Sequence, residues 1–451
     1  MNKENRNNWD IIVIGGGAAG LMAAGQAAEL GARVLLLEKT DGCGKKILVS
    51  GKTRCNLTNS ANLNHFIAMY GDNGRFLFNA FHHFFRPELL DFVNSQGLET
   101  KVERGGRIFP VSDDAHDVLR VFKKYLDANN VRIQLNTKAT DIIVKENAVC
   151  GVKAHDTIFN CKAVILATGG ATWPSTGSAG DGYTMSAALG HTVVKLRPSL
   201  VPLIVKEQKL AQAMQGVSLR NVRATAFQGE AASIDSTLTP DCVYGRGEKK
   251  RPKYPVIESR FGEMLFTHFG LGGPIILLMS LSVVEALEKG PVSVLIDLKT
   301  ALTREQLHKR LQTDLDKFSK RKITGIIKDY LPAKMIEPFI ALTGIEEDKQ
   351  AHQINAEERG KIVELLKALR FNIKSALPLE KAIVTAGGIS LKEIDPRTMA
   401  SRLIHGLYFC GEVMDIDADT GGYNLQAAFS TGYLAGQKAA GYAKISGEQT
   451  K

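Results

Sequence analysis

A strand, a glycine-rich turn and a helix follow one another at the start of the chain. The apolar run Asp10 to Ile14 has the composition of a buried parallel strand, and it leads directly into a GxGxxG turn made by Gly15, Gly17 and Gly20. In such turns one glycine permits the tight bend, one lets the backbone approach a diphosphate, and one lets the helix pack closely on the strand. The sequence therefore predicts a Rossmann-type βαβ unit that binds a dinucleotide.

The second strand of this unit, Ala32 to Leu37, ends on an acidic residue. Glu38 is placed to accept hydrogen bonds from the ribose hydroxyls of an adenosine, while the helix N-terminus offers N–H groups to the diphosphate. An acid here disfavours a ribose 2′-phosphate. The turn by itself does not distinguish FAD from NAD, so the remaining segments have to decide.

A polar loop follows the second strand almost at once. Residues 44–59 are rich in hydrogen-bond donors and poor in core residues. As a loop, this segment would bring Lys46, Ser50, Arg54 and Asn56 beside an anionic, polar ligand. The alternative is an unusually polar surface loop.

A second glycine-rich turn lies near the other end of the chain, between the strand-like run LYFC and the last helix. Gly421 and Gly422 let the backbone approach a flat ring, and the helix that starts near Asn424 would stabilise negative charge on a reduced flavin. Glu412 is suited to hydrogen-bond the ribityl hydroxyls. Two such turns fit an extended FAD, with the ADP at the first and the isoalloxazine at the second.

Hydrophobic patterning predicts four segments in an α/β chain of 451 residues. We expect an FAD-binding domain whose first part covers 1–197 and whose second part covers 373–451. An inserted β-rich domain over 198–300 and an inserted helical subdomain over 301–372 separate the two parts.

Local patterns refine this division. Short strands over 131–168 predict a β-meander appended to the parallel sheet. Two capping boxes predict helix starts in the helical subdomain, Thr303 with Gln306 and Asn355 with Glu358.

The compartment is predicted from cysteines and apolar runs. The six cysteines form no CxxC pair and no spacing suited to a metal, so we expect free thiols and no metal site. No apolar run approaches the roughly 20 residues needed to cross a bilayer, and the polar N-terminus does not resemble a signal peptide. The expectation is a cytoplasmic protein without a membrane partner.

The charge balance favours anionic partners. The net charge is +10, and such an excess suits phosphates, nucleotides or RNA, although solvated surface lysines would give the same composition. Much of the excess lies in two clusters, namely Arg246, Lys249, Lys250, Arg251 and Lys253, and Lys317, Lys320, Arg321 and Lys322.

Successive motifs along nearly the whole chain resemble the BaiN/RdsA-type NAD(P)/FAD-dependent oxidoreductases. They are DIIVIGGGAAGLMAA, GKKILVSGKTRCNLTN, GGRIFPVSD, ATGGATWPSTGSAGDGY, FTHFGLGGP, PLEKAIVTAGGIS and GEVMDIDADTGGYNLQAAFSTG. The resemblance implies a glutathione-reductase-like Rossmann FAD domain with a β-meander, interrupted by a β-barrel-like part and a small helical part. The chain departs from the family pattern at Lys45, where arginine is usual, at Lys52-Thr53, and at Gly272, where serine is usual.

The resemblance also implies the residues that contact the flavin. Cys55 is among them, and we interpret it as a small packed residue rather than a redox thiol, because no second cysteine lies at exchange spacing. The full set is Gly15, Gly17, Ala18, Glu38, Lys39, Lys46, Ser50, Arg54, Cys55, Asn56, Thr168, Gly169, Gly411, Glu412, Gly421, Gly422, Tyr423 and Asn424.

The predicted reaction is reduction of FAD by a nicotinamide nucleotide, followed by hydride delivery from N5 to an electron-poor double bond. Because the sequence has no second GxGxxG, NAD(P)H would visit the flavin transiently. His268 is the candidate proton donor, and Arg104 and Arg107 are candidates for holding an anionic or carbonyl-bearing substrate. Packed or surface roles are the alternatives for all three.

Three functions are compatible with these residues. The first is an FAD enzyme that acts on a small unsaturated or carbonyl-bearing molecule. The second reduces uridine in ribosomal RNA to dihydrouridine, as some members of the resembled family do. The third is a flavin-binding sensor without turnover. The substrate, the choice of NADH or NADPH, and the oligomeric state stay open.

Overall fold

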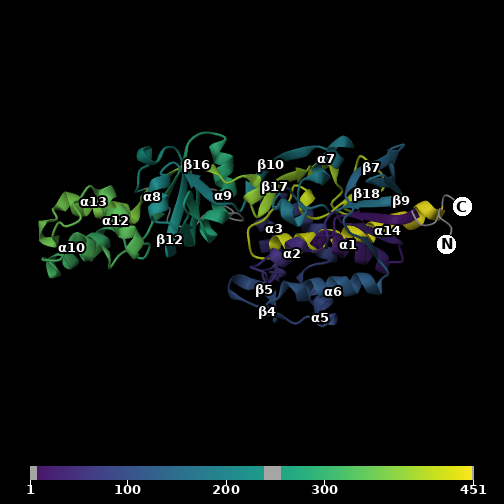
Figure 1. Cartoon of the computed structure of the whole chain (residues 1–451), viewed down its shortest axis with the longest axis horizontal. Helices are drawn as coiled ribbons and strands as arrows, with labels where there is room; N and C mark the ends of the chain where they lie inside the picture. The colour runs from purple at the N-terminus through teal and green to yellow at the C-terminus, as the bar shows by residue number, and fades with distance from the viewer. Residues whose placement is uncertain (1–7, 238–254, 449–451) are drawn as a thin grey trace. The chain divides into compact units, whose positions relative to one another are not determined.

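The chain divides into two compact units, of which one is discontinuous in sequence. A computed structural model describes residues 8–237 and 255–448. One unit consists of residues 1–197 and 383–451, and the other of residues 198–382, so the first unit contains both the purple and the yellow ends of the chain in Figure 1. The predicted junction at 373 falls inside the strand β16 (Leu369–Ala376), which is part of the second unit. The chain returns to the first unit at Ile383.

The first unit is built on a seven-stranded sheet with a parallel half and an antiparallel half. β1 pairs in parallel with β2 and β9, with Ile11 between Val34 and Ala163. Antiparallel β7, β8 and β9 form the predicted meander. In order across the sheet the strands are β6 (Arg132–Gln134), β2 (Val34–Leu37), β1 (Asn8–Ile14), β9 (Thr157–Leu166), β8 (Ala148–Ala154) and β7 (Ala139–Lys145), with β18 (Leu407–Phe409) also pairing with β9.

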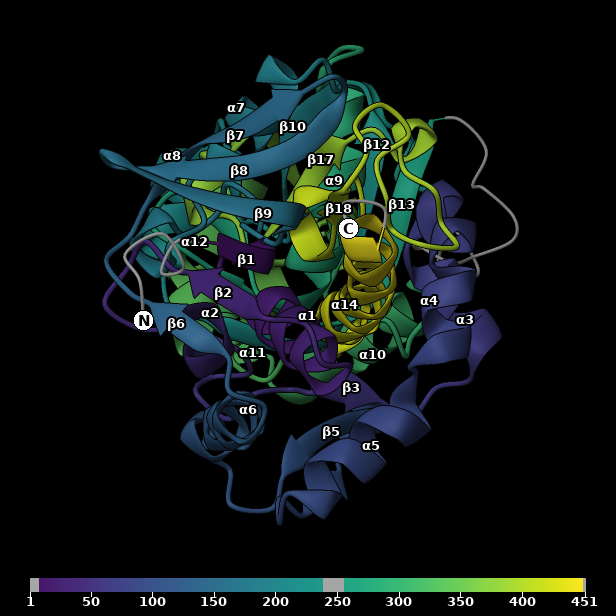
Figure 2. The same cartoon turned by 90° about the vertical axis from the view of Figure 1, so that its right-hand side faces the viewer.

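Two helices from opposite ends of the chain pack together in this unit. α1 (Ala18–Glu29) and α14 (Tyr423–Glu448) lie side by side, as Figure 2 shows. A Cβ atom added at Gly432 would lie 2.3 Å from the carbonyl oxygen of Ala19, and one added at Gly436 would lie 2.4 Å from that of Ala23. The two backbones are therefore in direct contact, which only glycine allows.

Smaller elements surround this framework. A three-stranded sheet has the order β3 (Thr58–Asn59), β5 (Arg107–Pro110) and β4 (Thr100–Val102), and β10 (Val193–Ser199) pairs with β17 (Val384–Ile389). The helices of this unit also include α2 (Lys45–Val49), α3 (Leu63–Met69), α4 (Phe78–His83), α5 (Arg86–Ser95), α6 (Ala115–Ala128) and α7 (Asp181–Ala188).

The second unit consists of a closed barrel and a group of helices. The strands follow one another around the barrel as β11 (Leu203–Val205), β14 (Gly270–Gly272), β13 (Val256–Phe266), β12 (Ser218–Gln228), β15 (Val292–Asp297) and β16. The helices are α8 (Gln208–Ala213), α9 (Pro274–Leu287), α10 (Arg304–Lys317), α11 (Ile323–Ile327), α12 (Ala333–Thr343) and α13 (Ala356–Lys367).

The expected fold class is confirmed. A Rossmann domain with a β-meander is interrupted by a barrel and a helical part. Both capping boxes form: Thr303 with Gln306 begins α10, and Asn355 with Glu358 begins α13. None of the helices in the described part of the chain is both long enough and apolar enough to span a membrane.

The contact between α1 and α14 predicts how glycine-to-alanine changes in α14 alter the free energy of unfolding. Gly432→Ala should lower the free energy of unfolding by about 1–3 kcal/mol, because its Cβ would push against the backbone of Ala19. Urea unfolding followed by circular dichroism measures the change. Gly441→Ala in the same helix is the control, because an added Cβ there meets no described atom within 4 Å, and it should be neutral or stabilising. Equal effects of the two changes would contradict the packing argument.

Candidate functional site

The first glycine turn has the geometry of a diphosphate-binding loop. Gly15 has a φ of +106°, and its N–H donates to the carbonyl of Leu37 at 2.9 Å. A Cβ added at Gly20 would lie 1.9 Å from the carbonyl oxygen of Gly15, whereas one added at Gly17 would meet no described atom within 4 Å. Gly17 thus borders open space at the N-terminus of α1, where N–H groups can reach an anion.

Glu38 holds this turn from the end of β2. Its carboxylate is buried and accepts from the backbone N–H groups of Gly16 and Thr40, both at 2.8 Å. Each carboxylate oxygen keeps a further lone pair that a ribose hydroxyl can use. The residue therefore fixes the loop as well as offering the predicted acceptor.

An ion pair joins the polar loop to the last glycine-rich segment. The Lys46 ammonium lies 2.6 Å from Glu412 Oε2 and 3.1 Å from Thr172 Oγ1. The other oxygen of Glu412 accepts from the N–H of Thr385 at 2.9 Å, and Thr385 Oγ1 accepts from the N–H of Ala171 at 2.9 Å. Four separate segments are therefore linked around this ion pair. Lys46 and Glu412 were predicted as site residues, whereas Thr172 and Thr385 were not.

The second glycine turn is tied to a turn that carries an arginine. Gly421 and Gly422 have φ values of +134° and +96°, and a Cβ added at Gly422 would lie 2.4 Å from the carbonyl oxygen of Thr58. The buried side chain of Asn59 donates to the carbonyl of Gly421 at 2.9 Å and to that of Gly105 at 3.0 Å. The sequence analysis did not single out Asn59, although it lies within the quoted motif.

Arg104 and Arg107 flank the turn that Asn59 holds. Both side chains are exposed, and Arg107 Nε donates to the carbonyl of Arg104 at 3.1 Å. Within the described ranges no carboxylate lies at ion-pair distance from either guanidinium. Both charges are thus available to an anionic or carbonyl-bearing ligand beside the second glycine turn.

Two other predicted contacts have carboxylate partners in the protein. Lys39 pairs with Asp181, which also lies 2.9 Å from Lys138. Although burial acts in the opposite direction, hydrogen bonds from these two lysines hold the pKa of Asp181 below its ordinary value.

The second of these contacts is Arg54. It bonds both oxygens of Glu103, at 2.8 and 3.3 Å, and lies 4.1 Å from the Phe109 ring centroid. Both cations therefore position neighbouring loops in this structure.

Several predicted flavin contacts in and near the polar loop are buried, and their protonation and hydrogen bonding indicate whether a ligand fits here. Cys55 is fully buried, and burial raises its pKa to about 12, so it is a thiol rather than a thiolate at neutral pH. Ser50 Oγ donates to the carbonyl of Ile47 at 2.7 Å. Asn56 Oδ1 and Thr168 Oγ1 are buried with no hydrogen-bond partner among the described residues. Buried polar atoms require partners, and a polar ligand in this cradle would supply them.

Other predicted contacts lie at the start of α14 and nearby. The side-chain amide of Asn424 accepts from the N–H of Ala418 and donates to its carbonyl, both at 2.9 Å. These two bonds fix the segment that leads into α14. Burial raises the pKa of Tyr423, whose ring meets the Phe66 ring edge-on at 4.8 Å. The N–H of Gly411, which has a φ of +73°, donates to Thr431 Oγ1 at 3.0 Å.

His268 belongs to the second unit. It lies at the tip of the hairpin between β13 and β14, and its exposed ring contacts Phe269 with centroids 4.8 Å apart. The N–H of Thr267 donates to the carbonyl of Gly270 at 2.9 Å and closes the turn. The candidate proton donor is therefore on a defined hairpin of a different unit from Arg104 and Arg107.

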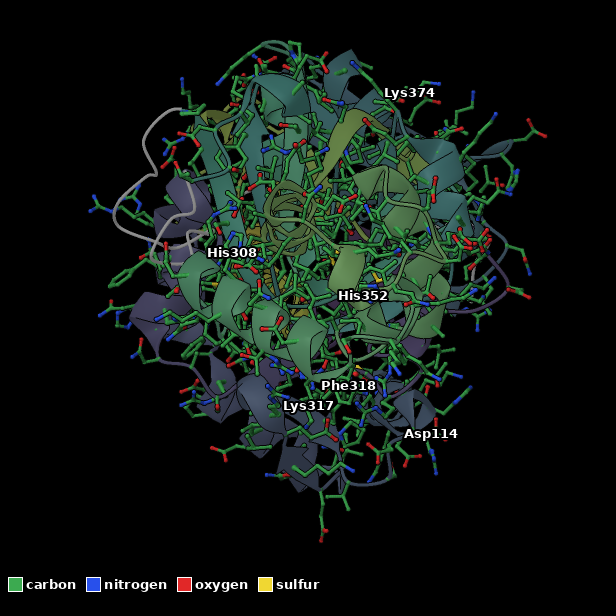
Figure 3. All side chains as sticks on the ribbon, turned by 90° about the vertical axis from the view of Figure 1, so that its left-hand side faces the viewer. Asp114, His308, Lys317, Phe318, His352 and Lys374 are labelled. Atoms are coloured by element: carbon green, nitrogen blue, oxygen red, sulfur yellow. The ribbon has the colours of Figure 1, made fainter. Side chains whose placement is uncertain are left out.

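One of the two basic clusters can be described. The cluster over 246–253 lies outside the described residues. In the other, the Lys317 ammonium and the Arg321 guanidinium lie 5.1 and 4.2 Å from the ring centroid of Phe318, at the end of α10 (Figure 3). Arg321 also pairs with Asp329 at 3.3 Å. An aromatic ring thus lies beside two cations here, which the sequence pattern did not indicate.

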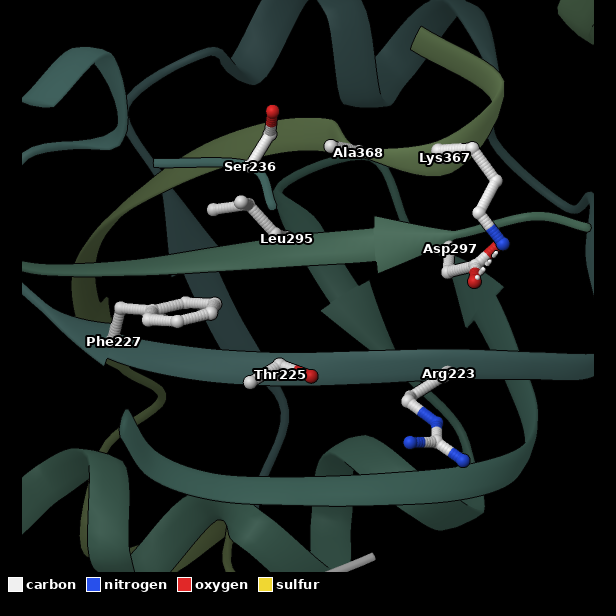
Figure 4. Close-up of a pocket in the computed structure, with 8 residues that line it drawn as sticks. All are labelled: Arg223, Thr225, Phe227, Ser236, Leu295, Asp297, Lys367 and Ala368. Atoms are coloured by element: carbon white, nitrogen blue, oxygen red, sulfur yellow. Dashed lines mark hydrogen bonds and ion pairs between the residues drawn. The ribbon is translucent and has the colours of Figure 1, made fainter. Parts of the chain in front are cut away.

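A small pocket in the second unit surrounds a buried ion pair (Figure 4). Lys367 Nζ lies 2.6 Å from Asp297 Oδ2 and also donates to the carbonyls of Leu302 and Lys299, at 2.8 and 3.2 Å. All three ammonium hydrogens are used inside the protein, so the pair is structural. In the described ranges no group of three His, Cys, Asp or Glu side chains could hold a metal ion.

Comparison with known proteins gives matches over nearly the whole chain. The HI0933-like protein Rossmann domain model matches residues 9–438. A 3-dehydro-bile acid delta(4,6)-reductase of Clostridium scindens is 32% identical over 433 residues, which is 95% of this chain and 98% of the relative. A ribosomal RNA dihydrouridine synthase of Haemophilus influenzae is 30% identical over 94% of this chain and 96% of its own.

Among solved structures, 3-ketosteroid-delta4-(5alpha)-dehydrogenase from Rhodococcus jostii RHA1 superposes with a TM-score of 0.48 at 14% identity. The superposition covers 96% of this chain and 97% of that chain.

The ion pair between Lys46 and Glu412 predicts a difference between two adjacent lysines. Lys46→Met should lower the free energy of unfolding by about 1 kcal/mol, because it leaves a partly buried carboxylate without its cation. Lys45→Met is the control and should change little, since Lys45 pairs only with the exposed Asp41. A double-mutant cycle with Glu412→Gln measures the coupling by urea unfolding. A coupling of zero would contradict the role of this pair.

Proposed function

The chain belongs to the HI0933-like family of flavoprotein oxidoreductases, and we propose that it is an FAD-dependent reductase of carbon–carbon double bonds conjugated with a carbonyl group. NADH or NADPH would supply the electrons. The observation that carries the proposal is that one unit contains both glycine turns, and that within it Lys46 of the polar loop is paired with Glu412.

The residues of the first unit fit an FAD from end to end. The turn at Gly17 would hold the diphosphate, and Glu38 would accept from the adenosine ribose. Gly421 and Gly422, with the N-terminus of α14, would take the flavin ring. When bound, FAD supplies the hydride-transfer chemistry. The partnerless oxygens of the predicted contacts Asn56 and Thr168 support a polar ligand in the same cradle.

The reductant would bind transiently. The sequence has one GxGxxG, so the chain provides one dinucleotide turn of this kind, and FAD would occupy it. A nicotinamide nucleotide would reduce the flavin and then leave before the substrate enters.

The substrate class follows from chemistry that two relatives share. One relative is named for reduction of a 3-dehydro-bile acid, and another for formation of dihydrouridine in ribosomal RNA. Both names describe reduction of a ring carbon–carbon double bond conjugated with a carbonyl. The exposed Arg104 and Arg107 support a substrate that has a carbonyl or an anionic group, since a guanidinium can bind either.

Reduction of such a bond also needs a proton. His268 is the proposed donor, because its exposed imidazole stands on a hairpin with a closed turn and histidine is the side chain that most often serves as a general acid. The role of the protein in this step is to hold the proton at the His268 ring.

Reduction of an RNA base is the second candidate, favoured by one observation. Lys317 and Arg321 both lie close to the Phe318 ring, and this combination of two cations and an aromatic ring suits phosphate contacts and base stacking. The affinity for an RNA transcript should then fall with salt and should fall again in Lys317→Ala/Arg321→Ala.

The proposed function predicts two separable half-reactions. Under anaerobic conditions NADH or NADPH should bleach the visible band of the bound flavin, and an α,β-unsaturated ketone should restore it while the saturated ketone does not. Stopped-flow absorbance measures both phases. A flavin that neither nicotinamide reduces would refute the proposal. Reoxidation by an RNA transcript alone would select the second candidate, and His268→Asn should slow only the reoxidation phase.

The two arginines predict a change in binding rather than in chemistry. Arg104→Gln/Arg107→Gln should raise KM for a carboxylate-bearing enone by about 10- to 100-fold, the equivalent of one or two charge-assisted hydrogen bonds, with kcat nearly unchanged. Steady-state kinetics measure both constants. Arg120→Gln is the control, because Arg120 is an exposed arginine on α6 that pairs with Asp117. An unchanged KM in the double variant would remove the arginines from the substrate site.

A further inference from the structure

Trp173 has a conformation that is unusual for a bulky residue. Its backbone lies in the left-handed region, with φ of 54° and ψ of 63°, and its side chain is 43% exposed. A non-glycine residue in this region is strained, and a large exposed aromatic ring gains little from packing.

The loop around Trp173 is nevertheless held firmly. Thr172 is fully buried and accepts from the Lys46 ammonium at 3.1 Å. On the other side, the carbonyl of Trp173 accepts from both the N–H and the hydroxyl of Thr176 at 2.8 Å. Because both neighbours are fixed, the backbone presents the indole at one place on the surface.

The same loop reaches the acid at the end of β2. A Cβ added at Gly177 would lie 3.4 Å from Thr40 Cγ2 and 3.6 Å from Glu38 Oε1. Gly177 is linked back to Pro174 by a hydrogen bond of 3.0 Å, so only one tight turn separates it from Trp173. Trp173 is therefore joined by one tight turn to the residue that borders the carboxylate which a ribose would contact.

We propose that Trp173 forms one wall of the adenine site and stacks on the adenine ring of FAD. The inference rests on the proposed FAD function and adds to it a contact for the adenine base. Stacking needs a flat, rigid and partly exposed ring beside the ribose, which this loop provides, and it recovers the cost of the strained backbone when the ligand binds. Trp173 is a binding residue in this role and takes no part in hydride transfer.

The chain permits a direct spectroscopic test, because it has only two tryptophans, Trp9 and Trp173. Trp9 lies at the start of β1 under the guanidinium of Arg33, at 4.5 Å. In the Trp9→Phe protein freed of flavin, Trp173 is the sole tryptophan. ADP and FAD should each quench its fluorescence to saturation, whereas FMN, which lacks adenine, should not. Quenching by FMN but not by ADP, or by none of the three, would overturn the proposal.

Affinity and stability together separate a stacking role from a structural one. Trp173→Gly should weaken FAD binding about tenfold or more, as expected for loss of one stacked base. The same change should leave the stability of the flavin-free protein equal or higher, because glycine tolerates a positive φ. Trp173→Phe should keep most of the affinity. A Trp173→Gly protein that is less stable but binds FAD normally would assign the indole to packing instead.

FAD binding by the unmodified protein and the response of Trp173 to adenine nucleotides are two separate measurements. If the unmodified protein does not bind FAD, as measured by flavin absorbance after dialysis, then the proposed function fails. If it binds FAD while Trp173 responds to neither ADP nor FAD, then only the adenine-site assignment fails.

Discussion

The architecture depends on a backbone contact between the first and the last helix. α14 can lie against α1 only because Gly432 and Gly436 have no side chains where the carbonyls of Ala19 and Ala23 approach. This contact brings the N-termini of both helices into the same unit, and each N-terminus follows a glycine turn. The proposed site for FAD therefore depends on packing, and the polar residues refine it.

The polar residues of the site connect segments and hold them in place. The Glu412 carboxylate binds the ammonium of Lys46, from the polar loop, and accepts from the N–H of Thr385 in β17. The Asn59 side chain donates to the carbonyls of Gly421 and Gly105 and so joins their two turns. Each of these side chains makes at least two bonds to elements that are distant in sequence. Such cross-links reduce the freedom of loops that would otherwise be mobile, and a preorganised cradle binds its ligand with less loss of entropy.

The sequence was informative where chemistry is local. The GxGxxG turn, the acid after the second strand and the two capping boxes are determined by neighbours within a few residues, and the structure has each of them. The parallel strands and the meander were equally readable, because buried strands have distinctive compositions. The predicted boundary between residues 372 and 373 cuts through the barrel strand β16, since a strand that follows a helix gives no signal of the sheet it will join.

Partners across long distances were the part that could not be predicted. Thr172, Thr385 and Asn59 are small polar residues whose importance lies in what they meet 27 to 362 residues away, and nothing in their own neighbourhood marks them. Likewise, Lys39 and Arg54 were expected to face the ligand, and the structure gives them carboxylates from other loops. Only the folded chain reveals which of several cations has a protein partner.

The interrupted order of the first unit also has a consequence for biosynthesis. During translation the ribosome produces α1 early and α14 last, with the whole of the barrel and the helical part between them. Until α14 emerges, the surface of α1 that it covers stays exposed to solvent, and the second glycine turn does not yet exist. Residues 198–382 can fold as a unit while the nascent protein waits for its final segment. The proposed FAD site is thus complete only after α14 has been synthesised.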